Sequence, residues 1–301
     1  MYLRSSLTRR RMLLGLAGVT GTAVLASCGS TSTLPLASTT TLAKEPTGYG
    51  LGARFPDGYN SSTIMAIGSP QRAPYVLLGS DGWPITENVP DSIELIIEHE
   101  GATLGPLTIN RHGEPGSTPY YPLIFTPPTV GVYTVTLNGS TATHLFKVKE
   151  PGDLPMLLVG EQLPPIETPT MINPQGIEPV CSRFEEPCPF HQLSVAEALK
   201  QSRPIAVLVS TPGFCQSDVC GPAVEVLIAA IALQEHDWSV IHAEVYVGPN
   251  NNDFTTAPVI DALGLPFEPS LYVANAQGTI TEVVHLTMDQ REVTAALATA
   301  V

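Results

Sequence analysis

Basic residues, aromatic residues and long apolar runs are all scarce in this chain of 301 residues. Lys and Arg number 14 against 28 Asp and Glu, which gives a formal net charge of −14 at pH 7. So acidic a chain repels polyanions, because affinity for nucleic acid depends on Lys and Arg that neutralise phosphates. A DNA- or RNA-binding role is therefore excluded, and the excess of acid is expected to serve solubility.

Charged residues make up only 14% of the chain and hydrophobic residues 43%, a balance typical of globular proteins. The length is sufficient for two domains, each with its own core. Beyond residue 28 no apolar run is long enough to cross a bilayer, which requires about 20 residues. We therefore do not expect the chain beyond residue 28 to span a membrane.

The first 28 residues have the layout of an export signal: a basic stretch, an apolar run from Met12, and small residues that end in a cysteine. The sequence LASC at residues 25–28 resembles the lipobox of bacterial lipoproteins, in which the cysteine is lipidated and becomes the new N-terminus. This resemblance implies loss of residues 1–27, a lipid on Cys28 and a place on the outer face of the bacterial cytoplasmic membrane.

The basic stretch of this leader has two interpretations. TRRRML at residues 8–13 resembles a twin-arginine signal, which exports folded proteins, and the alternative is an ordinary basic leader. Cleavage would remove four of the 14 basic residues and none of the acidic ones, so the mature chain would be more acidic still. Both export routes remain open at this point.

Residues 28–52 are rich in Ser, Thr and Gly and predict a flexible tether. Residues 53–150 hold short apolar runs separated by turn residues, which predicts an all-β sandwich. FTPPTVGVYTVTLNG at 125–139 resembles the closing strands of bacterial immunoglobulin-like domains. Alternation predicts that Tyr133, Val135 and Leu137 face the core. The histidines of this region lack the spacing of a metal site and are expected to be ordinary surface or core residues: His99, His112 and His144.

A proline-rich segment at 151–170 predicts an extended linker, and residues 171–301 alternate helix and strand signals, which is typical of an α/β domain. The expected elements are a short helix opened by the capping box Ser194–Glu197, a buried strand 205–210, a helix 222–234, a strand 238–247, a short helix between Pro258 and Gly264, a hairpin that turns at 275–278, and a last helix capped by residues 287–290.

Two of the five cysteines stand in STPGFCQSDVCGP, residues 210–222, between the buried strand and the long helix. This order of elements and FEPSLYVANAQG at 267–278 resemble the thioredoxin-like superfamily from about Gln192 to Val301. The resemblance implies an active site at Cys215 and Cys220, with Pro269 as a cis-proline that faces them. Val209 occupies the place of the buried acid that assists proton transfer in thioredoxins.

If Cys28 carries lipid, four cysteines remain, and an even number in an exported domain predicts disulfides. Pairing of sequence neighbours would join Cys181 with Cys188 and Cys215 with Cys220. Residues five apart in a helix point about 140° away from each other, so the second pair requires Cys215 in the loop and Cys220 in the first helical turn. Ser217 or Asp218 is then the expected N-cap.

Four functions are compatible with this motif. The leading one is thiol–disulfide exchange on exported thiol or disulfide proteins, in which Cys215 attacks and Cys220 resolves, without a cofactor. The second is a non-catalytic binding or scaffold module held by structural disulfides. The third rests on TPGFCQSDVC, which resembles a peroxiredoxin sequence. The fourth is copper or zinc handling by the segment Cys188–His191 with other thiols, although the leading interpretation contains no metal.

Overall fold

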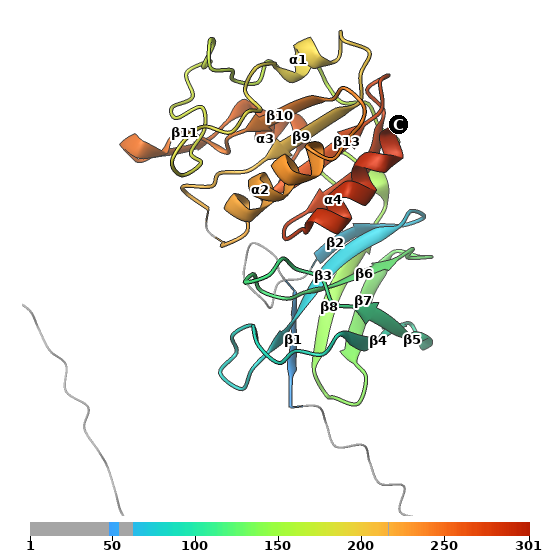
Figure 1. Ribbon diagram of the computed structural model, residues 1–301. Coiled ribbons are helices and arrows are strands. Elements are labelled where there is room, and N and C mark those ends of the chain that lie inside the picture. The colour runs from blue at the N-terminus through green and yellow to red at the C-terminus, as the bar shows by residue number, and fades with distance from the viewer. Residues whose placement is uncertain (1–47, 54–62, 216) are drawn as a thin grey trace, which may run out of the picture. The chain divides into compact units, whose positions relative to one another are not determined.

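The computed structural model describes residues 48–53, 63–215 and 217–301, which form a β-sandwich followed by an α/β domain (Figure 1). The leader, Cys28 and most of the predicted tether lie outside the described residues. The described residues all fall within one compact unit, Lys44–Val301. Throughout the ranges that the structure describes, no helix is both long and apolar enough to cross a membrane.

Two sheets form the sandwich, which confirms the all-β prediction for this part of the chain. The smaller has the antiparallel order β1-β3-β6, with bounds β1 (Gly50–Ala53), β3 (Gln71–Leu78) and β6 (Tyr121–Phe125). The larger has the order β2-β8-β7-β4-β5, and only its β2–β8 pair is parallel. Its strands are β2 (Thr63–Ala66), β4 (Ser92–His99), β5 (Ala102–Asn110), β7 (Gly131–Leu137) and β8 (Thr143–Lys149).

The core of the sandwich lies between these two sheets and follows the alternation of the strands. Tyr133, Val135 and Leu137 are buried in it, as predicted, and the Tyr133 ring stacks on Phe146 with centroids 5.2 Å apart. Leu51 of β1 is also buried in this core. The predicted extent of the tether is therefore wrong at its end, because an apolar Leu within a Gly-rich stretch completes the sheet edge.

The sheet of the second domain has the order β10-β9-β13-β14 (Figure 1). Its strands are β9 (Ile205–Val209), β10 (Ser239–Ala243), β13 (Ser270–Ala274) and β14 (Ile280–His285). β10 is parallel to β9, whereas β13 is antiparallel to both β9 and β14. The predicted strand 238–247 is divided, since β11 (Tyr246–Gly248) leaves the sheet and pairs with β12 (Asp253–Thr256).

Both faces of this sheet are buried, which explains why all five residues of β9 are apolar. Ile205, Val207 and Val209 share one core with residues of α1 (Val195–Ala198) and α3 (Pro258–Leu263). Ala206 and Leu208 point into the opposite core, which contains α2 (Cys220–Ile231) and α4 (Gln290–Leu297). Three short 3₁₀ turns complete the described elements: Pro151–Asp153, Pro249–Asn251 and Ala298–Ala300.

The predicted helix ends are confirmed in three cases. Ser194 and Glu197 form the capping box of α1. The helix α3 begins at Pro258 and ends at Leu263, and its C-cap is Gly264, whose φ of 62° suits glycine. The cap of α4 lies within the predicted segment 287–290, at Asp289, whose carboxylate accepts a hydrogen bond from the Glu292 N–H.

The segment 151–170 is not the free linker that its prolines predict. Leu163 and Ile166 are buried in the core of the α/β domain. Backbone hydrogen bonds also tie it to that domain, because Gly160 donates to the Ile280 carbonyl and Leu163 to that of Gly278. Apolar residues spaced between the prolines turn the segment into a part of the second domain.

A buried polar network joins the sandwich to α4. The guanidinium of Arg72 donates to both carboxylate oxygens of Glu292 at 2.7 Å, and to the carbonyl oxygens of His285 and Thr287 at 2.8 and 2.7 Å. Tyr120 also donates to Glu292. The side chains of Arg72 and Glu292 are only 12% and 11% exposed, so this ion pair is largely shielded from water.

His285 is expected to make the protein less stable in acid. Burial, together with the nearby charge of Arg72, lowers the pKa of this histidine to about 3, whereas an unfolded histidine titrates near about 6.5. The unfolded chain therefore binds a proton between these values that the folded chain does not, so the free energy of unfolding falls as pH drops below about 6.5.

Urea denaturation at a series of pH values measures this effect. The His285→Gln variant should lose part of the decrease in stability between about pH 6.5 and 3, whereas the exposed His236→Gln variant should keep it. Equal slopes for the His285→Gln variant and the parent chain would contradict the assignment.

Candidate functional site

Cys215 and Cys220 form a disulfide at the junction of β9 and α2, with their Cα atoms 6.0 Å apart. Cys215 lies in the loop and Cys220 is the first residue of the helix, as predicted. The predicted cap is wrong, however, because the N-cap is Val219 and no side chain caps the helix. The helix therefore begins directly at Cys220, and the Val219 side chain is buried.

The two cysteines differ in exposure. Cys220 is fully buried, whereas Cys215 is partly exposed, and its sulfur lies 3.4 Å from the Ser217 hydroxyl oxygen. A thiol reagent or a partner protein would therefore meet the Cys215 sulfur first. This asymmetry is what a pair with one attacking and one resolving thiol requires.

Glu268, which directly precedes Pro269 in the chain, approaches the disulfide. The Glu268–Pro269 peptide bond is cis, so the part of the prediction that makes Pro269 a cis-proline is confirmed, and its role in a site stays a prediction. A carboxylate oxygen of Glu268 lies within 4.8 Å of both cysteine sulfurs. Burial raises the pKa of Glu268, so this carboxyl group holds a proton more readily than a surface glutamate.

Sequence reasoning missed Glu268 because it looked for an acid only at Val209, which lies in the core. The sole available signal was its position directly before the predicted cis-proline. A carboxyl group of raised pKa next to a thiol pair can accept a proton from one thiol and return it later. The structure thus supplies an acid from the loop that precedes β13.

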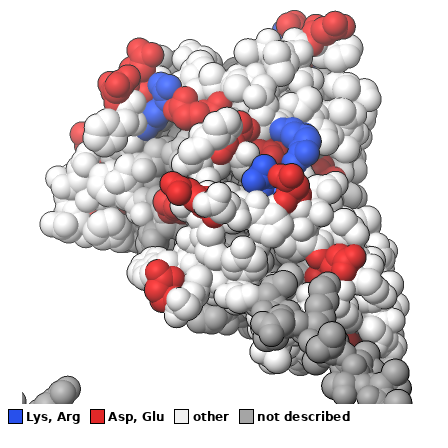
Figure 2. Space-filling view, turned by 60° about the horizontal axis from the view of Figure 1, so that its bottom comes forward, with Lys and Arg blue, Asp and Glu red and all other residues white. Residues whose placement is uncertain are grey.

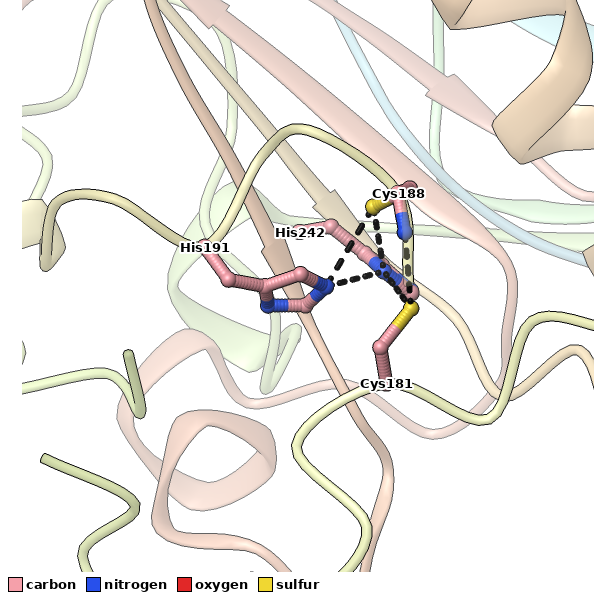
Figure 3. Close-up of side chains that lie close together, drawn as sticks. All are labelled: Cys181, Cys188, His191 and His242. Atoms are coloured by element: carbon pink, nitrogen blue, oxygen red, sulfur yellow. Dashed lines mark hydrogen bonds between the residues drawn. The ribbon is translucent and has the colours of Figure 1, made fainter. Parts of the chain in front are cut away.

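A second cluster contains Cys181, Cys188, His191 and His242 (Figure 3). Both cysteines are free thiols, so the predicted Cys181–Cys188 disulfide is wrong. The chain between the two cysteines does bring their sulfurs close together, but two histidine side chains share the space with them. His242 comes from the middle of β10, and the other three residues come from the segment that precedes α1.

The ligand atoms of this cluster converge on one point. His242 Nδ1 lies 3.3 Å from the Cys188 sulfur, 3.8 Å from the Cys181 sulfur and 3.2 Å from His191 Nε2. The distance from the Cys188 sulfur to His191 Nε2 is 3.3 Å. Cys188, His191 and His242 are at most 3% exposed, and Cys181 is partly buried.

The two thiols influence each other's protonation. The pKa of Cys181 is lowered, chiefly because the Cys188 thiol hydrogen-bonds to it. The same hydrogen bond, together with burial, raises the pKa of Cys188. The pair therefore favours one thiolate, stabilised by the neighbouring thiol.

A short hydrogen-bonded chain connects this cluster with the disulfide loop. Ser182, next to Cys181, donates from its backbone and hydroxyl to Glu244 at 2.6 and 3.0 Å. Gly213 in turn donates to the Ser182 hydroxyl at 2.9 Å. A Cβ at Gly213 would lie 2.9 Å from the Ser182 carbonyl oxygen, so this approach requires glycine. The segment that carries Cys181 and the loop that carries Cys215 are therefore in direct contact.

The surface shown in Figure 2 is in keeping with the acidic composition. Acidic side chains are spread over this face, and the basic groups visible there lie beside acidic ones. Among the described residues, Arg72 is paired with Glu292 and Arg183 with Glu225. Such pairing leaves little positive charge to attract a polyanion.

No protein-family model and no curated protein sequence matches the chain. Solved structures that match part of it include the Lin-41 filamin domain, at 11% identity and a TM-score of 0.24, over 35% of this chain and 97% of that one. Others are the Titin M10-Obscurin like 1 Ig complex (18% identity, TM-score 0.21, 35% and 98% covered) and the ZirS C-terminal Domain (12% identity, TM-score 0.21, 48% and 96% covered). At these scores the likenesses carry no argument about function.

Proposed function

We propose that this protein is a thiol–disulfide exchange protein of the bacterial cell envelope, anchored through lipid on Cys28 and acting through Cys215 and Cys220 of a thioredoxin-like domain. Its first domain is proposed to be immunoglobulin-like. The observation that carries the proposal is the asymmetric disulfide, with a partly exposed Cys215, a buried Cys220 and the Glu268 carboxylate close to both sulfurs.

The proposed reaction has two steps. In the reduced protein, the Cys215 thiolate attacks a substrate disulfide, forms a mixed disulfide and releases one substrate thiolate. The Cys220 thiol then gives its proton to Glu268, attacks the Cys215 sulfur and releases the second substrate thiolate. Two electrons pass from the cysteine pair to the substrate, and the reverse sequence oxidises a substrate dithiol.

Each neighbouring group has a role in this scheme. The start of α2 places the positive end of the helix dipole near the cysteines, which favours the thiolate form. Glu268 serves as the proton acceptor of the buried thiol, where water is scarce. Pro269 is proposed to face the cysteines, as the thioredoxin-like resemblance implies; it has no N–H, and its carbonyl oxygen accepts a hydrogen bond from the Leu286 N–H at 2.7 Å.

The reduction potential of the Cys215–Cys220 pair tests this function. Thiol trapping and mass spectrometry across a graded dithiol buffer should give a value of roughly −120 to −270 mV, the span of exchange proteins. Peptide mapping separates this pair from Cys181 and Cys188. A value below about −300 mV would mark a structural disulfide and would favour the non-catalytic binding module instead.

A further inference from the structure

We propose that Cys181, Cys188, His191 and His242 bind one Zn²⁺ ion. This inference is independent of the proposed exchange function, because it concerns different cysteines. It rests on three observations: the distances within the cluster, the direction of the His242 lone pair, and the types of ligand atom.

The distances match a tetrahedral site. Zn–S bonds of about 2.3 Å and Zn–N bonds of about 2.0–2.1 Å place neighbouring ligand atoms about 3.3–3.8 Å apart. The four contacts measured between side-chain atoms of Cys181, Cys188, His191 and His242 are 3.2, 3.3, 3.3 and 3.8 Å. All four ligand atoms lie within 4.8 Å of one another, as they would around one ion (Figure 3).

The protonation of His242 also favours an ion. Its Nε2 lies 3.1 Å from the Ser210 carbonyl oxygen and 2.9 Å from the Ser210 hydroxyl. A carbonyl oxygen only accepts, so Nε2 carries the proton and Nδ1 turns its lone pair toward the cluster. The Cys181 sulfur, the Cys188 sulfur and His191 Nε2 all lie around this lone pair. A single hydrogen bond can satisfy only one of these contacts, whereas one ion can bind all four atoms. Such a contact behind a histidine is the usual device that orients a metal ligand.

The donor set selects the metal. Two cysteines and two histidines in a closed, water-poor cluster are ligands of structural zinc, whereas Mg²⁺ and Ca²⁺ prefer oxygen. Two thiolates would balance the charge of Zn²⁺, which matters in a site where Cys188, His191 and His242 are at most 3% exposed. No carboxylate belongs to the group of four.

An ion here would hold an irregular segment in place. Residues 171–193 form neither helix nor strand, and His242 belongs to β10. Zinc would tie that segment to the sheet and, through Ser182 and Gly213, steady the loop that leads to Cys215. We therefore expect the ion to stabilise the α/β domain without touching the disulfide.

Metal analysis of the purified full chain in detergent is the test. We expect about one zinc per chain after dialysis, and addition of Co²⁺ to the chelator-stripped chain should give the visible bands of tetrahedral cobalt with a thiolate charge-transfer band. The Cys188→Ser and His191→Asn variants should fall to near zero zinc, whereas the exposed His236→Asn control and Cys215→Ser should keep it.

The cobalt spectrum requires no variant, so a variant that fails to fold does not spoil the test. A stripped chain that takes up neither Co²⁺ nor Zn²⁺, or peptide mapping that finds a Cys181–Cys188 disulfide in the exported protein, would overturn the site. Binding of Cu(I) with exclusion of zinc would overturn the choice of ion. None of these outcomes alters the potential of the Cys215–Cys220 pair, so the two proposals fail separately.

Discussion

The Cys215→Ser variant is expected to lose all thiol–disulfide exchange, down to the rate of the uncatalysed reaction. Cys215 is the partly exposed residue of the pair, so it is the one that a substrate disulfide is expected to meet first. Its serine hydroxyl is not ionised at neutral pH and cannot form the mixed disulfide. Reduction of a model disulfide substrate, followed by release of substrate thiols, measures the loss.

The Cys220→Ser variant should behave differently, because it keeps the attacking thiol and lacks the resolving one. It should accumulate the mixed disulfide between Cys215 and the substrate, which non-reducing electrophoresis and mass spectrometry detect. The exposed His236→Asn variant, beyond the far end of α2, serves as the control and should exchange normally. An active Cys215→Ser variant, or a mixed disulfide trapped on Cys220, would contradict the assigned roles.

The Arg72→Leu variant is expected to lose about 3–5 kcal/mol of unfolding free energy, the cost of leaving a buried charge without its partner. The substitution would strand the Glu292 carboxylate and two backbone carbonyls that Arg72 now satisfies. Urea denaturation of the Arg72→Leu variant and of the parent chain measures the difference in unfolding free energy.

The exposed pair of Arg203 and Asp237, at 3.9 Å, provides the control. Arg203→Leu should cost about 0–1 kcal/mol, since water already screens that pair. The Arg72→Leu/Glu292→Leu double variant should be more stable than Arg72→Leu alone, because it removes the stranded charge as well. A loss no larger than that of Arg203→Leu would show that the buried pair contributes little.

Local patterns predicted the elements of both domains well. Alternation at Tyr133, Val135 and Leu137 identified a core face, and the all-apolar run at β9 identified a strand buried on both sides. The capping box at Ser194 and the left-handed glycine at 264 marked helix ends, since both are governed by residues close in sequence. The disulfide between Cys215 and Cys220 followed from the same local reasoning.

The polar sites depend on contacts between distant residues, and there the sequence was less informative. Pairing of neighbours suggested a Cys181–Cys188 disulfide, but His242 lies 54 residues beyond Cys188 and approaches only when β10 joins the sheet. A histidine within a mainly apolar buried strand was the available signal for His242. Glu268 was missed for a similar reason. It lies just before β13, and its carboxylate approaches the cysteine sulfurs only when β13 pairs with β9.

The packing of residues 154–166 decides where the protein can be divided. Leu157 N–H donates to the Leu263 carbonyl, and Leu163 lies in the core beneath the sheet. A fragment cut at residue 170 would leave that core open to solvent, whereas one begun at Pro151 would carry its own cover. The α/β domain that could be fused or transplanted intact therefore begins near Pro151, about twenty residues before the end of the proline-rich segment at 170.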